Sequence, residues 1–85
     1  MALKSRREVV CAHVVRILRI ERERQCLSMT VLAKRAGLSQ AMISFVEREL
    51  RNPTLDTLLR ISEVLEIDFA VVLSQAQKEA KAGAK

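Results

Sequence analysis

The side chains that could do chemistry in this chain are few, and their spacing suits neither catalysis nor metal binding. Cys11 and Cys26 stand fifteen residues apart without a CxxC pair, and His13 is the only histidine, so no metal-ligand set is present. No nucleophile–base pair and no Gly-rich phosphate loop occurs. We therefore expect no enzymatic activity, no metal and no cofactor. We expect both cysteines to be reduced, with redox sensing as the alternative.

The charged residues are distributed unevenly, which favours a binding function. Residues 1–25 carry seven basic and three acidic side chains, and residues 26–53 carry four and two. Residues 54–77 reverse the balance, with one basic and four acidic side chains. A basic half beside an acidic part is typical of a nucleic-acid binder. Charge alone is equally consistent with a small helical protein kept in solution by its surface.

The elements that must position such side chains are organised around residues 29–48. Two sets of apolar residues each lie on one helical face: Leu32, Ala33 and Ala36, then Ile43 and Val46. Gly37 follows the first set, where a left-handed residue ends a helix without a Cβ clash. Leu38 then fills the gap, and Ser39 can cap a second helix. This pattern predicts a helix-turn-helix.

The surrounding sequence resembles the Cro/repressor-type family of bacterial and phage transcription regulators, also called XRE or lambda-repressor-like. The stretch that carries the resemblance is LAKRAGLSQAMISFVERELRNPTLDTLLRISEVLEID. The resemblance implies an all-α fold of five helices with the helix-turn-helix at the second and third. It also implies a sequence-specific regulator of double-stranded DNA, acting as a homodimer on a roughly palindromic operator. We expect one domain over residues 1–77 and a flexible basic tail over 78–85.

The resemblance assigns two kinds of DNA contact. Base readers on the helix 40–48 are Gln40, Ala41 and Phe45. Residues expected to contact phosphate are Thr30, Lys34, Arg35, Ser39, Ser44, Arg48, Arg51 and Asn52. Because no Arg or Lys stands between Ala36 and Glu47, we expect no guanine contact from this helix. For Phe45, the alternative to a base contact is packing onto Leu50.

Two positions depart from the family pattern, and a third that matches it has an expected structural role. Met29 replaces a frequent Gln and cannot make its hydrogen bonds. Glu49 stands where Gly is usual, so the helix 40–48 could continue for another turn. Glu47 matches a nearly constant Glu, and we expect it to brace the motif through Arg24 or Arg35.

Periodicity and capping signals predict helices over 6–24, 29–36, 40–48, 55–65 and 69–79. The expected N-caps are Ser5, Ser28, Ser39, Thr54 and Asp68. The residues expected to be almost fully buried are Leu18, Leu32, Ala33, Leu38, Ile43, Val46, Leu58, Leu59, Leu65 and Leu73.

The last helix is also the expected dimer interface, since family members commonly dimerise through it. The residues concerned are Phe69, Ala70, Val71 and Val72. The helix 6–24 is apolar over more than one face. That breadth indicates either a wide buried face or a second contribution to the interface.

A protein-interaction module that keeps the fold is the alternative function, as in an antitoxin or anti-repressor partner. Met29, Met42 and Phe45 would make the DNA-facing side unusually apolar, and exposed apolar patches often mark protein interfaces. No apolar run approaches the roughly 20 residues of a membrane span. We expect a cytoplasmic protein with no membrane contact and no small-molecule ligand.

Overall fold

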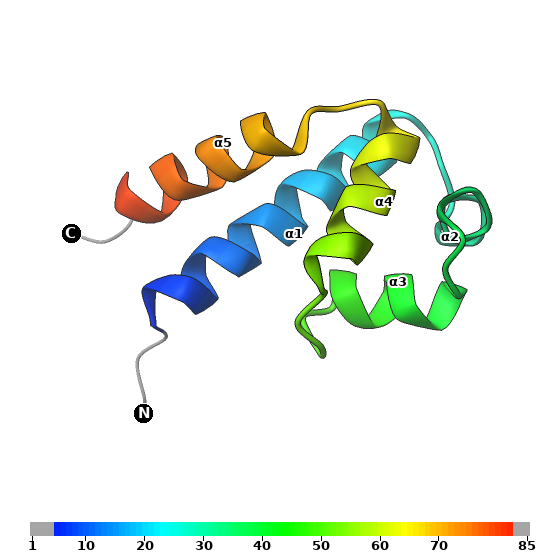
Figure 1. Ribbon diagram of the computed structural model, residues 1–85, viewed down its shortest axis with the longest axis horizontal. Helices are drawn as coiled ribbons and strands as arrows, with labels where there is room; N and C mark the ends of the chain where they lie inside the picture. Colours follow the sequence, from blue (N-terminus) through cyan, green and yellow to red (C-terminus); the bar gives the residue numbers. More distant parts are fainter. Residues whose placement is uncertain (1–4, 83–85) are drawn as a thin grey trace.

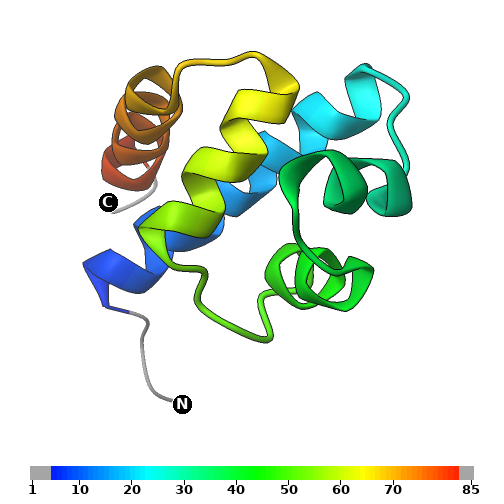
Figure 2. The same cartoon turned by 45° about the vertical axis from the view of Figure 1, so that its right-hand side comes forward.

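The computed structural model describes residues 5–82, and within that range the chain forms five α-helices and no strand (Figure 1). The helices are α1 (Arg6–Arg24), α2 (Met29–Ala36), α3 (Gln40–Glu47), α4 (Leu55–Leu65) and α5 (Phe69–Ala82). The long α1 crosses the middle of the molecule, with α5 alongside it and α2 and α3 at the opposite side of α4 (Figures 1 and 2). The all-α, five-helix prediction is confirmed.

Each helix begins at the predicted cap. The hydroxyls of Ser28, Ser39 and Thr54 each accept a hydrogen bond from the backbone N–H three residues on, at 3.0–3.1 Å. Ser5 does the same for Glu8, whose carboxylate accepts from the Ser5 N–H in return, a complete capping box. Asp68 accepts from the Ala70 N–H at 2.9 Å. These bonds satisfy donors that would otherwise lack a partner in the first turn.

The first four helices end with the same C-capping motif. A residue with positive φ is followed by an apolar residue whose N–H bonds to a carbonyl five residues back, the Schellman arrangement. The left-handed residues are Cys26, Gly37, Glu49 and Glu66, with φ of 58°, 71°, 58° and 57°. Only Gly37 adopts that conformation without a Cβ penalty. The prediction that α3 could continue past Glu49 is therefore wrong, because Glu49 turns left-handed and ends it.

The core lies where all five helices meet. Its buried members are Val14, Leu18, Leu32, Ala33, Ile43, Ile61, Leu65, Val72 and Ala76. Most of the expected core residues are present, but Leu59 and Leu73 are exposed by 41% and 37%. Leu38 and Leu58 are only half-buried. A five-helix domain of this size has few sites enclosed on all sides, so leucines beside the core stripe remain at its edge.

The last helix extends further than expected, to Ala82 rather than residue 79. Ala80 is buried, and Glu79 is held by Arg16 and His13 of α1 at 2.8 and 3.0 Å. Residues 78–82, predicted to belong to a flexible tail, therefore continue α5 against α1. The rest of that predicted tail, residues 83–85, lies outside the described residues. None of the helices seen between residues 5 and 82 is long and apolar enough to cross a membrane.

Candidate nucleic-acid interface

The crossing of α2 and α3 is packed as a helix-turn-helix requires. Ala33 and Ile43 are exposed by only 3% and 1%, and Leu32 and Val46 by 1% and 2%. The small Ala33 side chain lets the axis of α3 pass close to α2. Leu38 joins them, since its N–H bonds to the Ala33 carbonyl at 2.8 Å. The two short helices thus form one rigid unit.

With Ile43 and Val46 buried, α3 presents its other side to solvent. Gln40 and Ala41 are exposed at its N-terminal end. Ser44, Phe45 and Arg48 follow Ala41 at spacings of three, four and seven, so they share its face. The structure therefore places the three predicted base readers on one outward surface. A helix with such a surface can lie in the major groove of DNA, with its N-terminal residues next to the bases.

The ring of Phe45 is half-buried, and an arginine side chain stacks on it. The guanidinium carbon of Arg51 lies 5.2 Å from the ring centroid, within the range of a cation–π contact. Leu50, the predicted packing partner, remains 57% exposed. Arg51 therefore lies against the side chain of Phe45, and it also lines a hollow between the loop after α3 and the first half of α1. This contact could not be predicted from the sequence, because the turn that brings Arg51 back depends on the left-handed Glu49.

The predicted phosphate-contacting residues do not all gather at one place. Arg48, Arg51 and Asn52 are exposed together at the end of α3 and in the following loop, and Thr30 is exposed in the first turn of α2. Arg35 instead lines a hollow of about 370 Å³ beside α4, with Asp56, Arg60 and Glu63. Three residues of the set remain: Lys34 is exposed in the last turn of α2, Ser39 caps α3, and Ser44 is half-buried within α3.

A nearly buried ion pair braces α3 against α1. Arg22 donates through Nε and Nη2 to the two carboxylate oxygens of Glu47 at 2.7 and 2.9 Å, and through Nη1 to the Leu27 carbonyl at 2.7 Å. Hydrogen bonding to Glu47 raises the pKa of Arg22. The predicted partners, Arg24 and Arg35, are wrong, since Arg24 pairs with Glu21 in its own helix. Arg22 could have been found, because it follows Val14 and Leu18 at spacings of four along the buried stripe.

A second side chain that the sequence analysis missed holds the end of α2. Arg60 of α4 donates from Nη1 to the Ala36 carbonyl at 3.3 Å and from Nε to Asp56 at 2.8 Å. The carbonyls of the last helical turn lack intrahelical partners, so this bond stabilises the start of the turn at Gly37. A Cβ on Gly37 would lie 3.1 Å from the same Nη1 atom.

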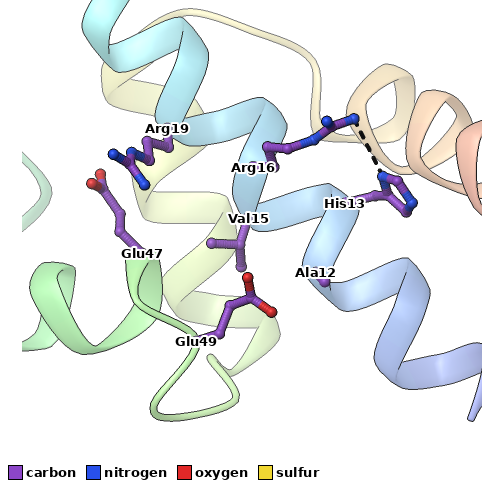
Figure 3. A pocket seen from close by; sticks show the side chains of 7 residues that line it. All are labelled: Ala12, His13, Val15, Arg16, Arg19, Glu47 and Glu49. Atoms are coloured by element: carbon purple, nitrogen blue, oxygen red, sulfur yellow. Dashed lines mark hydrogen bonds between the residues drawn. The ribbon is translucent and has the colours of Figure 1, made fainter. Parts of the chain in front are cut away.

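A shallow hollow of about 280 Å³ lies between α1 and the end of α3 (Figure 3). Arg16 and Arg19 line it from α1, with Arg19 directed toward Glu47 and Arg16 toward His13, and Glu47 and Glu49 line it from the other side. These charges are engaged by other groups, because Glu47 binds Arg22, Arg16 binds Glu79 and Arg19 pairs with Glu23. We interpret the hollow as a gap between packed helices and not as a binding site.

The cysteines and the histidine form no chemical centre. Cys11 and Cys26 are free and exposed. Across residues 5–82, no group of three or more potential ligands could hold a metal ion. The half-buried Met29 packs against the core, so it adds less to an apolar outer surface than its sequence position suggested.

These elements define a compact helix-turn-helix domain with a polar, partly basic outer surface on α3 and the loop after it. Comparison with known proteins agrees with that class. The helix-turn-helix family profile matches residues 18–72, from the second half of α1 into the first turns of α5. The chain therefore belongs to the XRE-type helix-turn-helix family, as its sequence indicates.

Relatives of known sequence and structure carry the same motif. The chain is 39% identical over 59 residues to an uncharacterized HTH-type transcriptional regulator of Mycobacterium tuberculosis, covering 69% of this chain and 42% of that protein. It is 34% identical to a second such regulator, y4dL of Sinorhizobium fredii, covering 69% of this chain and 30% of that one. The match thus spans less than half of either relative.

The fold also matches a solved structure, a mutant of the restriction-modification controller protein C.Esp1396I. The TM-score is 0.77 with 26% sequence identity, and the match covers 87% of this chain and 96% of the other. The two chains are therefore alike over almost the whole domain, including the part of α1 that precedes the family profile.

Proposed function

We propose that this chain is a sequence-specific binder of double-stranded DNA and acts as a transcription regulator. The observation that carries the proposal is the outward row on α3 and the following loop, with Gln40, Ala41 and Phe45 beside Arg48 and Arg51, all fixed by the buried α2–α3 crossing. Gln can bond bidentately to adenine, and Ala and Phe can contact a thymine methyl group. The names of the sequence relatives support the same class of function.

In this proposal, polar and basic residues around the row hold the DNA backbone. Arg48, Asn52 and Lys34 are exposed and would contact phosphate, with the hydroxyls of Thr30, Ser39 and Ser44. Such contacts set the orientation of the protein and carry no sequence information. Of the predicted phosphate contacts, Arg35 is the least suitably placed, because it lines the hollow beside α4.

We further propose a two-fold homodimer formed through α5, with its exposed Ala70 and Val71 and the half-buried Phe69. Val71 is 64% exposed, so its side chain is available for contact with a second copy. Val72, which the sequence placed in the same interface, is 4% exposed and packs in the core of its own protomer, so it is excluded from this surface. A two-fold pair would address two half-sites about one helical turn, or ~34 Å, apart.

Selection of bound sequences from random duplex DNA tests the proposal. We expect enrichment of an approximately palindromic site and an affinity that falls steeply with salt. No enriched sequence, together with a protein that co-purifies in defined stoichiometry, would contradict the regulator and support the interaction module.

A further inference from the structure

The cation that stacks on Phe45 comes from the loop after α3 and not from α3 itself. No Arg or Lys stands between Ala36 and Glu47, yet the guanidinium of Arg51 lies over the ring of Phe45 at 5.2 Å. Phe45 follows Ala41 by four residues and therefore lies one helical turn along the same face. The loop after α3 thus brings one cation into the row of proposed base readers.

The contact with Phe45 leaves the hydrogen-bonding groups of Arg51 available. A guanidinium stacked on a ring uses its face, whereas its five N–H donors point outward along its edges. Among the residues that the structure describes, no carboxylate pairs with Arg51. Arg22 and Arg24 differ from Arg51, because their N–H donors are bound to the carboxylates of Glu47 and Glu21.

We propose that Phe45 and Arg51 form one reading unit, in which the ring holds the guanidinium for a bidentate contact with a guanine edge. Arg51 is then a specificity-determining residue, and Phe45 is its positioning residue. This inference rests on the proposed DNA-binding function. It changes the role predicted for Arg51, from phosphate contact to base contact, and supplies the guanine contact that α3 itself cannot make.

The reason lies in the different demands of the two kinds of contact. A phosphate presents oxygens in several directions and accepts a mobile cation, so a stacking partner adds little. A guanine offers O6 and N7 only in the plane of the base, and the fork of Arg must be aligned with that plane. Fixing the plane on an aromatic ring reduces the rotamer entropy lost on binding. The stacked guanidinium is therefore better suited to recognising a base than to binding a phosphate.

The test uses the full chain, the site selected from random DNA, and the same site with each base pair substituted in turn. Arg51→Lys keeps the charge but removes the fork, and Phe45→Leu keeps an apolar side chain but removes the aromatic face. We expect both variants to lose about ten- to a hundredfold of discrimination at one G·C pair per half-site. Affinity for unrelated DNA and its salt slope should change little. Wild-type protein should lose the same discrimination when 7-deazaguanine, which lacks N7, replaces that guanine.

Two further variants calibrate the result. Arg19→Lys makes the same exchange on the exposed side of α1 and should keep wild-type selectivity. Arg48→Ala should weaken binding to all sequences alike. Unchanged discrimination in Arg51→Lys would overturn the reading role, and unchanged discrimination in Phe45→Leu alone would overturn the positioning role. A wild-type protein that selects no sequence would overturn the proposed function itself.

Discussion

Arg22 and Glu47 face one another as a fork and a carboxylate, joined by two hydrogen bonds of 2.7 and 2.9 Å, and their side chains are only 10% and 8% exposed. The pair ties the last residue of α3 to the last turns of α1. A third bond from Arg22, to the Leu27 carbonyl, fixes the connection that leads into α2. One side chain therefore sets the position of both helices of the motif relative to α1.

Breaking this pair from one side should be costly. Arg22→Met leaves the Glu47 carboxylate nearly buried without its partner, and we expect a loss of about 3 kcal/mol in the free energy of unfolding. The double variant Arg22→Met/Glu47→Leu should recover most of that loss, because no buried charge then remains. Urea denaturation measures both. Arg19→Met is the matched control and should scarcely move the midpoint, since Arg19 is exposed and its contact with Glu23, at 3.5 Å, lies within the same helix. A double variant no more stable than the single one would contradict this explanation.

The fold could largely be predicted from the sequence, because its signals are local. Ser and Thr caps, the glycine at position 37 and the spacing of Leu32, Ala33, Ile43 and Val46 each act within a few residues. They predicted the start of every helix and the crossing of α2 and α3. The end of α5 was missed because Glu79 and Ala80 are held by contacts with α1, sixty residues away in the chain.

The candidate site was predictable only in part, for the same physical reason. Helical spacing placed Gln40, Ala41 and Phe45 on one outward face. Spacing along α1 marks Arg22 as a buried position, but its pairing with Glu47 depends on how the helices are placed. The position of Arg51 depends on how the chain turns after α3, which spacing within a helix does not encode. Leu59 was expected in the core from its periodicity, but none of the helices between residues 5 and 82 covers it fully, and it is 41% exposed.

The end of α4 should become more stable when its left-handed residue is replaced. Glu66 has φ of 57°, a conformation that costs an L-residue more than glycine. We expect Glu66→Gly to raise the free energy of unfolding by roughly 0.5–1 kcal/mol. Glu63→Gly, in the interior of the same helix, should lower it by about 1 kcal/mol. Thermal denaturation of the two variants gives the comparison, and a loss of stability in Glu66→Gly would contradict the assigned strain.

Acid should weaken the junction between α1 and the end of α4. Hydrogen bonds from Arg24 and Gln25 lower the pKa of Glu21 from 4.5 to about 2. Because the pKa is lower in the folded state, the stabilisation is present above pH 4.5 and is lost as the pH falls from 4.5 towards 2. Gln25 also donates to the Leu65 carbonyl at 2.8 Å, so the two helix ends share this bond.

The measurement is the free energy of unfolding of Glu21→Gln relative to wild type, from neutral pH down to about pH 2. The two proteins should differ most at neutral pH and converge near pH 2. A difference that stays constant with pH would contradict a role for the ionised Glu21 carboxylate.

Association should depend on the exposed side of α5. Val71→Asp places a charge on a side chain that is 64% exposed in the protomer, so the fold should survive while dimerisation weakens. Sedimentation equilibrium measures the change, and circular dichroism checks the helix content. Gln77→Asp puts the same charge elsewhere on α5 and serves as the control. Wild-type protein that sediments as a monomer at high micromolar concentration would remove the proposed interface.

The central claim, that α3 reads sequence while the residues around it hold phosphate, is tested most directly by a salt titration of two variants. Arg48→Ala should weaken binding to the selected site and to unrelated DNA alike, and should reduce the slope of log affinity against log salt by about one. Gln40→Ala should leave that slope unchanged and cost roughly 1–3 kcal/mol on the selected site only. Equal losses on every sequence for both variants would contradict the assignment of α3 as a reading helix.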